Sequence, residues 1–286
     1  MTGAISLDLH DREHRIEAFY DGYGKEREWG RFESPLGEVQ LAVITAFLDR
    51  WALPAGRTLD VGSGPGRFAI WLAQRAAEVT LLDISGAMLE AAKEQFAAHD
   101  LTAEGFLHQS LFDLGDLELG MFDVVLCLGG TLNYFPDDME AGFRLLARRL
   151  KPGGRLVGSV MSTVGALGAA LHVGWLPEPE IGGEELLGVY CTGRLTEHFS
   201  EHQAKMLHAE ELGALLGRSG LRVLDLSATD CLLSLPQTQL AALRSRPDMF
   251  AALLQAEVDA CRRNPDAGGH ILFAATPLNL PAVLGK

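Results

Sequence analysis

The sequence has too few basic residues for a protein that works on nucleic acid. Lys and Arg number 24 against 38 Asp and Glu, which gives the 286-residue chain a net charge of −14. Binding to a phosphate backbone depends on basic side chains that displace counterions. An anionic membrane surface disfavours an acidic chain for the same electrostatic reason. We therefore expect neither nucleic acid nor a membrane among its partners.

Cysteine is also scarce, and no export signal is visible. The four cysteines form no C-x-x-C pair and no Cys/His cluster with zinc spacing: Cys127, Cys191, Cys231 and Cys261. The first ten residues lack the basic region and the apolar stretch of a secretion signal. We expect reduced thiols, no metal site and a cytoplasmic protein.

One uncharged stretch, residues 156–175, is long enough to cross a bilayer. It contains four Gly, two Ser, a Thr and a His, and it follows a Pro-Gly-Gly turn. A buried strand that continues into a covered segment is therefore the better interpretation.

Hydrophobic residues make up 48% of the chain, enough to build a core. From residue 58 onward, short apolar runs alternate with segments of helical apolar spacing, which is typical of β-α-β units with a parallel sheet. Seven runs predict strands: Thr58–Gly62, Glu78–Asp83, Gly105–His108, Phe122–Leu128, Arg155–Met161, Leu221–Ser227 and His270–Thr276. Their nearly continuous apolar character predicts an α/β fold whose sheet is covered on both faces.

The alternation divides the chain into three regions. Residues 1–57 precede the first strand and are expected to form a helical lid region, and residues 58–161 hold the regular alternation. Residues 162–286 contain two insertions, 162–208 and 228–269, together with a helix at 209–219 and the last two strands. Because loops on a rigid scaffold usually meet the substrate, we expect substrate choice to reside in these insertions.

A glycine-rich turn follows the first predicted strand, in the segment Asp60-Val-Gly-Ser-Gly-Pro-Gly66. Such a turn brings main chain close to a ligand and points helix N-terminal amides at it. The dinucleotide fingerprint requires a third Gly at position 67, where this chain has Arg67. Asp83 ends the next strand, where a carboxylate can accept ribose hydroxyls. On its own, such a turn could equally be a tight connection between a strand and a helix that binds no ligand.

Four blocks in the usual order resemble the class I S-adenosylmethionine-dependent methyltransferases. They are residues 60–66, Val-Thr-Leu-Leu-Asp-Ile-Ser at 79–85, Phe-Asp-Val-Val-Leu at 122–126 and Leu-Lys-Pro-Gly-Gly-Arg-Leu at 150–156. The resemblance covers residues 57–161 strongly. It implies S-adenosylmethionine as the cofactor. It also implies a seven-stranded Rossmann-like sheet, mostly parallel with one antiparallel strand, with helices on both faces and lid or cap insertions.

The resemblance also implies a set of cofactor contacts. Glycine main chain would face the methionine moiety, and the two carboxylates at 60 and 83 would face its ammonium group and the ribose. Ile84 would pack on the adenine, and Asp113 would accept from the adenine amino group beside the Phe112 amide. The implied set is Asp60, Gly62, Ser63, Gly64, Asp83, Ile84, Met88, Phe112, Asp113 and Leu128, with Tyr20 and Arg31 from the N-terminal region.

Methyl transfer relies mainly on alignment, and orientation alone supplies roughly 7–11 kcal/mol of a barrier. A hydroxyl or ammonium acceptor also needs a base. The candidates are His198, His202 and Tyr134. A histidine taken at random is more often a surface or core residue than a base.

The N-terminal region is unusually aromatic, with five aromatic residues inside residues 19–32: Phe19, Tyr20, Tyr23, Trp29 and Phe32. One interpretation is a helix packed on the sheet edge. The other is a lid that places aromatic faces near the sulfonium cation and Arg31 near a carboxylate.

The leading functional hypothesis is methylation of an oxygen or nitrogen on a small-molecule substrate, in specialised metabolism. The segment after the fourth strand, Leu128-Gly-Gly-Thr-Leu-Asn-Tyr134, lacks the Asn-Pro-Pro motif of enzymes that methylate amino groups of bases or glutamine. Methylation of RNA or protein and a non-catalytic scaffold remain alternatives. A homodimer is compatible with the sequence.

Overall fold

The computed structural model describes residues 8–52, 56–172, 182–195, 200 and 202–278. Its centre is a seven-stranded sheet in the order β3-β2-β1-β4-β5-β9-β8. The strands are β1 (Arg57–Val61), β2 (Glu78–Asp83), β3 (Gly105–His108), β4 (Phe122–Cys127), β5 (Leu150–Met161), β8 (Leu221–Ala228) and β9 (His270–Pro277). Strand β9 runs antiparallel to both of its neighbours, and the other pairs are parallel. The predicted fold class is confirmed.

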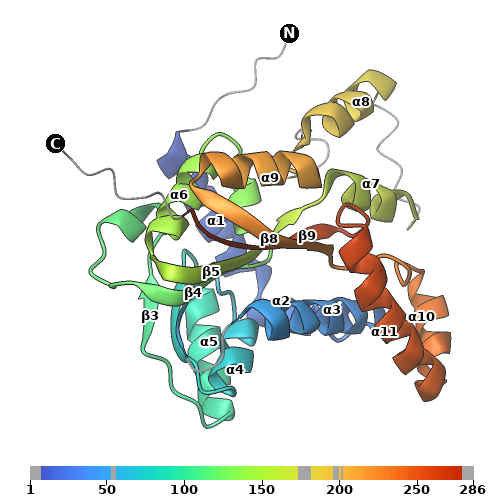
Figure 1. Cartoon of the computed structure of the whole chain (residues 1–286), viewed down its shortest axis with the longest axis horizontal. Helices are drawn as coiled ribbons and strands as arrows, with labels where there is room; N and C mark the ends of the chain where they lie inside the picture. Colours follow the sequence, from blue (N-terminus) through green and yellow to red (C-terminus); the bar gives the residue numbers. More distant parts are fainter. Residues whose placement is uncertain (1–7, 53–55, 173–181, 196–199, 201, 279–286) are drawn as a thin grey trace.

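Helices cover both faces of this sheet (Figure 1). One face carries α3 (Pro35–Trp51), α4 (Arg67–Ala73) and α5 (Gly86–Ala98), and the other carries α6 (Met139–Arg148) and α9 (Ala209–Arg218). Helices α10 (Gln237–Arg244) and α11 (Pro247–Arg263) pack against α3 near the β8–β9 side of the sheet. The two faces therefore have separate apolar cores.

Local sequence explains where the covering helices begin and which side they bury. The Ser34 hydroxyl caps α3 by accepting from the Gly37 N–H at 3.0 Å, with Pro35 in the first turn. Val39, Val43 and Phe47 follow at helical spacing and are all buried. Thus α3 belongs to the covering layer of the sheet even though it precedes the first strand.

The N-terminal helices α1 (Leu9–Tyr23) and α2 (Lys25–Gly30) lie at the carboxyl end of the parallel strands. The insertion after β5 forms α7 (Thr163–His172), α8 (Gly183–Thr192) and a short antiparallel pair, β6 (Arg194–Leu195) with β7 (Ala204–Lys205). The sequence analysis did not anticipate this pair. Within the described ranges, no helix is both long and apolar enough to cross a membrane.

Candidate active site

The glycine-rich turn between β1 and α4 adopts a backbone that only glycine tolerates well. Gly62, Gly64 and Gly66 have φ values of +68°, +52° and +79°. A Cβ at Gly62 would overlap the Thr131 side chain, and one at Gly66 would lie 3.1 Å from Leu81 Cδ2. The spacing G-x-G-x-G therefore reflects both the turn and the close packing of α4 on β2.

Asp83 ends β2 beside this turn and is buried, with 7% of its surface exposed. Its Oδ2 accepts the Gly64 N–H at 2.7 Å, and its Oδ1 accepts the Ser85 N–H at 2.8 Å. Burial raises the pKa of Asp83 to about 6, although the two main-chain hydrogen bonds act in the opposite direction. The carboxylate keeps lone pairs for a ligand because each oxygen has used only one.

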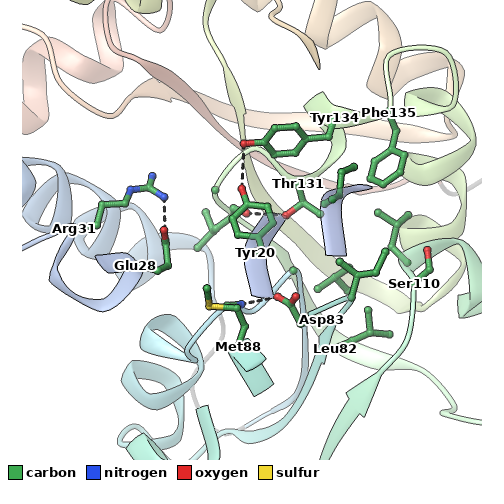
Figure 2. Close-up of a pocket in the computed structure, with 18 residues that line it drawn as sticks. Tyr20, Glu28, Arg31, Leu82, Asp83, Met88, Ser110, Thr131, Tyr134 and Phe135 are labelled. Carbon is green, nitrogen blue, oxygen red and sulfur yellow. Dashed lines mark hydrogen bonds and ion pairs between the residues drawn. The ribbon is translucent and has the colours of Figure 1, made fainter. Parts of the chain in front are cut away.

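A first pocket opens above Asp83, between the sheet edge and α1 (Figure 2). The hollow, counted together with the solvent space open to it, measures about 720 Å³, and apolar and polar side chains both line it. Nine residues singled out from the sequence line it: Tyr20, Arg31, Gly62, Gly64, Asp83, Ile84, Met88, Leu128 and Tyr134. Residues from α1, α2, β1, β2 and the segment after β4 thus converge on one pocket.

A second pocket of about 700 Å³ continues from the first on the α3 side of the glycine-rich turn. The two pockets share six lining residues: Glu28, Arg31, Gly62, Gly64, Leu128 and Gly129. Asp60 and Ser63 line only the second pocket. This pocket also takes polar side chains from α3, β5 and β9, namely Gln40, Ser159 and His270.

Asp60 differs from Asp83 in its surroundings. It is 3% exposed, and no described residue donates a hydrogen bond to its side chain. Burial raises the pKa of Asp60 to about 7, and the negative charge of Asp83 adds to the effect. Around neutral pH this carboxyl can therefore exchange a proton.

Two expected adenine contacts lie away from both pocket linings. The Asp113 side chain is exposed and accepts the Ser110 N–H at 3.2 Å, as part of a capping box on the short 3₁₀ helix Leu111–Gly115. Phe112 packs edge-on against Phe135, with ring centroids 4.9 Å apart. Ser110 and Leu111 line the first pocket at this position.

Of the three candidate bases, Tyr134 and His202 lie close together. The Tyr20 hydroxyl donates to the Tyr134 hydroxyl at 3.0 Å, and the His202 ring centroid lies 5.9 Å from that of Tyr134. His202 also contacts Phe19 at 4.5 Å between ring centroids. Burial raises the pKa of Tyr134. His198 lies outside the described residues.

Helix α1 is held over the first pocket by three acidic side chains spaced four residues apart. Glu17 Oε1 lies 3.1 Å from His108 Nε2, and Glu13 accepts from the Ser110 hydroxyl. Asp21 accepts from the Ser85 hydroxyl at 2.6 Å. The spacing 13, 17, 21 was present in the sequence, but the expectation for the N-terminal region rested on its aromatics and Arg31.

Helix α2 contributes an ion pair and a cation–π stack. Arg31 Nη1 lies 3.1 Å from Glu28 Oε1 where the pockets meet. The Arg67 guanidinium lies 4.1 Å from the Trp29 ring centroid and donates to the Trp29 carbonyl. Arg67, which stands where the dinucleotide fingerprint requires glycine, thus connects α2 to α4. Phe32, also in this region, is buried in the core beneath α3.

The thiols and acids of the described ranges form no metal site, since no group of three or more His, Cys, Asp or Glu is arranged to hold an ion. Cys127 is a buried core residue, and burial raises its pKa to about 12. All four cysteines are free thiols.

Comparison with known proteins shows which family the chain resembles in sequence. A family model described as "Methyltransferase domain" matches residues 58–154. A ubiquinone biosynthesis O-methyltransferase from Xanthomonas axonopodis pv. citri (strain 306) is 30% identical over 215 residues, which is 75% of this chain and 80% of the relative. The enzyme of the same name from Xanthomonas oryzae pv. oryzae (strain PXO99A) is 29% identical over 214 residues, with the same coverage of both chains.

Solved structures share the fold. The magnesium protoporphyrin IX methyltransferase of Synechocystis PCC 6803 with bound S-adenosylhomocysteine has a TM-score of 0.60 at 18% identity, over 93% of this chain and 99% of that one. The Burkholderia thailandensis 1,6-didemethyltoxoflavin-N1-methyltransferase has a TM-score of 0.56 at 16% identity, over 97% and 94%. With these matches, the chain belongs to the class I S-adenosylmethionine-dependent methyltransferases and is an enzyme that uses S-adenosylmethionine.

Proposed function

We propose that this enzyme transfers the methyl group to an oxygen or nitrogen of a small-molecule metabolite. The observation that carries the proposal is the pair of joined pockets beneath the chain's own N-terminal helices. Each is lined by apolar side chains together with a few polar and charged groups, as small-molecule sites are. The related enzymes named above include O- and N-methyltransferases, which supports either atom as the acceptor.

The residues around the first pocket fit the cofactor chemically. Asp83 retains lone pairs for the two ribose hydroxyls, and Ile84 and Met88 offer apolar contacts for the adenine. The main chain at Gly62–Gly64 and the Arg31 guanidinium suit the ammonium and carboxylate of the methionine moiety. The sulfonium supplies a methyl group that is already activated, so the protein mainly orients the partners and excludes water.

Helices α1 and α2 would act as the lid, a role supported by their position over both pockets. The side-chain hydrogen bonds that fasten α1 reach the ends of β2 and β3, while Ile16 of the same helix is buried in the core. Polar contacts can be exchanged for water more readily than a packed apolar face, which suits a segment that must admit ligands. Helix α3 and Phe32 belong to the core and lie outside this proposed lid.

Tyr134 and His202 would border the opening of the first pocket, next to Tyr20. Because the raised pKa of Tyr134 keeps its hydroxyl protonated, we assign it a hydrogen-bonding role there in preference to that of a base. The insertions at 162–208 and 228–269 would complete the acceptor side, as expected of loops mounted on this scaffold.

The direct test is S-adenosylhomocysteine release from S-adenosylmethionine, measured with a metabolite extract and, separately, with total RNA. Product formation with the extract and none with RNA is the expected result. Formation with RNA alone would refute the small-molecule assignment. A protein that binds S-adenosylhomocysteine in calorimetry but releases none with either mixture would instead match the scaffold alternative.

A further inference from the structure

A short 3₁₀ helix, Thr131–Tyr134, links the first pocket to the insertion that follows β5. Its first and last residues line the pocket (Figure 2). Thr131 packs against Gly62 of the glycine-rich turn, and the Tyr134 hydroxyl accepts from Tyr20 of α1 at 3.0 Å. The position of this helix therefore determines where two pocket-lining side chains stand against the glycine-rich turn and α1.

Asn133 belongs to the same 3₁₀ helix but lines neither of the two pockets, and its side chain is fully buried. Its Oδ1 accepts the Met161 N–H at 2.9 Å, and its Nδ2 donates to the Lys205 carbonyl at 2.5 Å. Its main-chain N–H donates to the Gly130 carbonyl at 2.9 Å. One side-chain amide therefore bonds to β5 on one side and to β7 on the other.

Met161 and Lys205 lie where the insertion leaves the sheet and where it returns. Met161 is the last residue of β5, and β7 ends at Lys205. Just beyond, the Leu207 N–H donates to the Met161 carbonyl at 2.9 Å, and the Thr163 N–H donates to the Leu207 carbonyl at 3.0 Å. The outgoing and returning segments are thus bonded to each other, and the Asn133 amide bonds to both of them.

A second tie between the segment after β4 and the β6–β7 pair lies on the surface. Arg194 of β6 donates to Asp137 at 2.5 Å, and the two side chains are 51% and 52% exposed. Exposed ion pairs contribute little, because water and salt screen them. A buried amide differs, since its loss leaves main-chain N–H and carbonyl groups without partners away from water. Asn133 is therefore the stronger of these two ties.

The chain that leads into β7 carries a ring that meets Tyr134. His202 lies two residues before β7, and its ring centroid is 5.9 Å from that of Tyr134 and 4.5 Å from that of Phe19 on α1. Asn133 directly precedes Tyr134 in the chain, and its amide holds β7 through the Lys205 carbonyl. The separation of the two rings therefore depends on Asn133 from both sides.

We propose that Asn133 is a positioning residue for methyl transfer: its amide holds β7 so that His202 and Tyr134 border the acceptor at a fixed distance from the cofactor. The proposal rests on the proposed function, which gives these two rings to the acceptor side. Asn133 itself reaches neither ligand and acts through the rings. Because a misplacement of about 1 Å can lower a rate by about 100-fold, loss of the amide should affect transfer far more than cofactor binding.

The first experiment compares N133D and N133A with wild type. Asp at this position keeps an oxygen for the Met161 N–H but has no N–H for the Lys205 carbonyl, whereas Ala loses both bonds. Both variants should form S-adenosylhomocysteine from the metabolite extract about 10- to 100-fold more slowly. Their dissociation constants for S-adenosylhomocysteine should stay within about threefold of wild type, since the amide lies outside both pocket linings.

The matched control is S219A, which removes a buried hydroxyl that donates to the Leu215 carbonyl at 2.9 Å. It should lower the melting temperature while turnover and cofactor affinity stay at the wild-type values. Equal losses of turnover and cofactor affinity in the Asn133 variants would overturn the proposal. Non-cooperative melting of both variants would overturn it too, because Asn133 would then be a residue of the core alone.

The second experiment needs no methyl acceptor. The ¹³Cε1 resonances of His202 and of the exposed His99, at the end of α5, are recorded with saturating S-adenosylhomocysteine in wild type, N133D and S219A. The His202 resonance should move in N133D and stay in place in S219A, with His99 unchanged in both. An unmoved His202 resonance in N133D would overturn the proposal. A wild-type enzyme that releases no S-adenosylhomocysteine with the extract would instead count against the proposed function, and the His202 resonance would still decide whether Asn133 holds β7.

Discussion

Each of the two pockets contains a buried carboxylate, and the two carboxylates differ in their hydrogen bonds to the protein. Asp83 accepts two main-chain N–H groups, whereas no described residue donates to the Asp60 side chain. Burial raises the pKa of both, to about 6 and about 7 respectively. The first pocket therefore presents an anchored acceptor, ready for hydroxyl donors. In the second pocket, the Asp60 carboxyl can gain or lose a proton near neutral pH, so its charge depends on the ligand that binds beside it.

The largest expected effect comes from removing the anchored carboxylate. D83A should weaken S-adenosylhomocysteine binding by about 10- to 100-fold, because two ribose hydroxyls lose a charged acceptor. Isothermal calorimetry at pH 7.5 measures it. D113A is the matched control and should bind within about twofold of wild type, since that exposed carboxylate caps a 3₁₀ helix. Equal losses in the two variants would restore Asp113 as an adenine contact and erase the distinction drawn here.

The raised pKa of Asp83 predicts a pH dependence of the same binding. Above about pH 6 the carboxylate is ionised and accepts from the ribose, and below it the bound proton removes that acceptor. The association constant for S-adenosylhomocysteine should therefore fall by up to about tenfold per unit below pH 6. Titration calorimetry between pH 5 and 8 is the measurement, with D83N as a variant that should show a flatter profile. A wild-type profile as flat as that of D83N would contradict the assignment.

A smaller effect is expected from releasing α1. Changing its acidic row to amides, as E13Q/E17Q/D21N, removes charged acceptors for Ser110, His108 and Ser85. Cofactor affinity should drop by roughly 3- to 10-fold, with hydrogen exchange of α1 accelerated and the melting transition still cooperative. Loss of cooperativity would show that α1 is part of the core. In that case the buried side chain of Ile16, which is 5% exposed, would be the contact that joins α1 to the core.

Asp60 is expected to change the pH dependence of the free energy of unfolding of the cofactor-free protein. Its folded-state pKa is above the unfolded value, so its favourable contribution is present below about pH 4 and is lost as pH rises through about 7. D60N has no charge to bury, so its free energy of unfolding relative to wild type should improve by at least about 1 kcal/mol from pH 4 to pH 8. Denaturant melts of the cofactor-free protein measure the difference. A pH-independent difference would mean that the carboxyl is solvated in the open pocket.

The smallest change is Y20F, which deletes one hydroxyl that donates to Tyr134 at 3.0 Å. A neutral hydrogen bond of this kind contributes about 0.5–1.5 kcal/mol. Turnover with the metabolite extract should fall by about 2- to 10-fold with little change in melting temperature. W29A removes the Arg67 stack instead and should lower the melting temperature more than Y20F does. The reverse order would make Tyr20 the packing residue.

Much of the first pocket could be predicted because its residues come from short contiguous segments. The glycine-rich turn and the carboxylate at the end of the next strand are close along the chain, and the blocks that contain them resemble a known family, so Gly62, Gly64 and Asp83 could be singled out without coordinates. The alternation of apolar runs likewise predicted all seven strands of the sheet, with ends that differ by a few residues at most except at β5, which begins five residues earlier, at Leu150.

The polar side chains that β5 and β9 contribute to the second pocket could not be predicted in this way. Ser159 and His270 meet only because β9 reverses direction and pairs with β5 in one particular register. A shift of β9 by one residue against β5 would turn the His270 side chain to the opposite face. His198 and His202 were predicted instead, since proximity along the chain was the only available measure of proximity in space.

The antiparallel course of β9 also means that two distant parts of the chain build the ligand edge of the sheet. Parallel strands reach the ligand edge with their carboxyl ends, so the loops that follow them carry the donor-binding motifs. Strand β9 reaches the same edge with its amino end, and the chain arriving there comes from α10 and α11, which pack on the far side of α3. The wall of the second pocket at His270 therefore depends on a part of the chain that is distant in sequence from the glycine-rich turn.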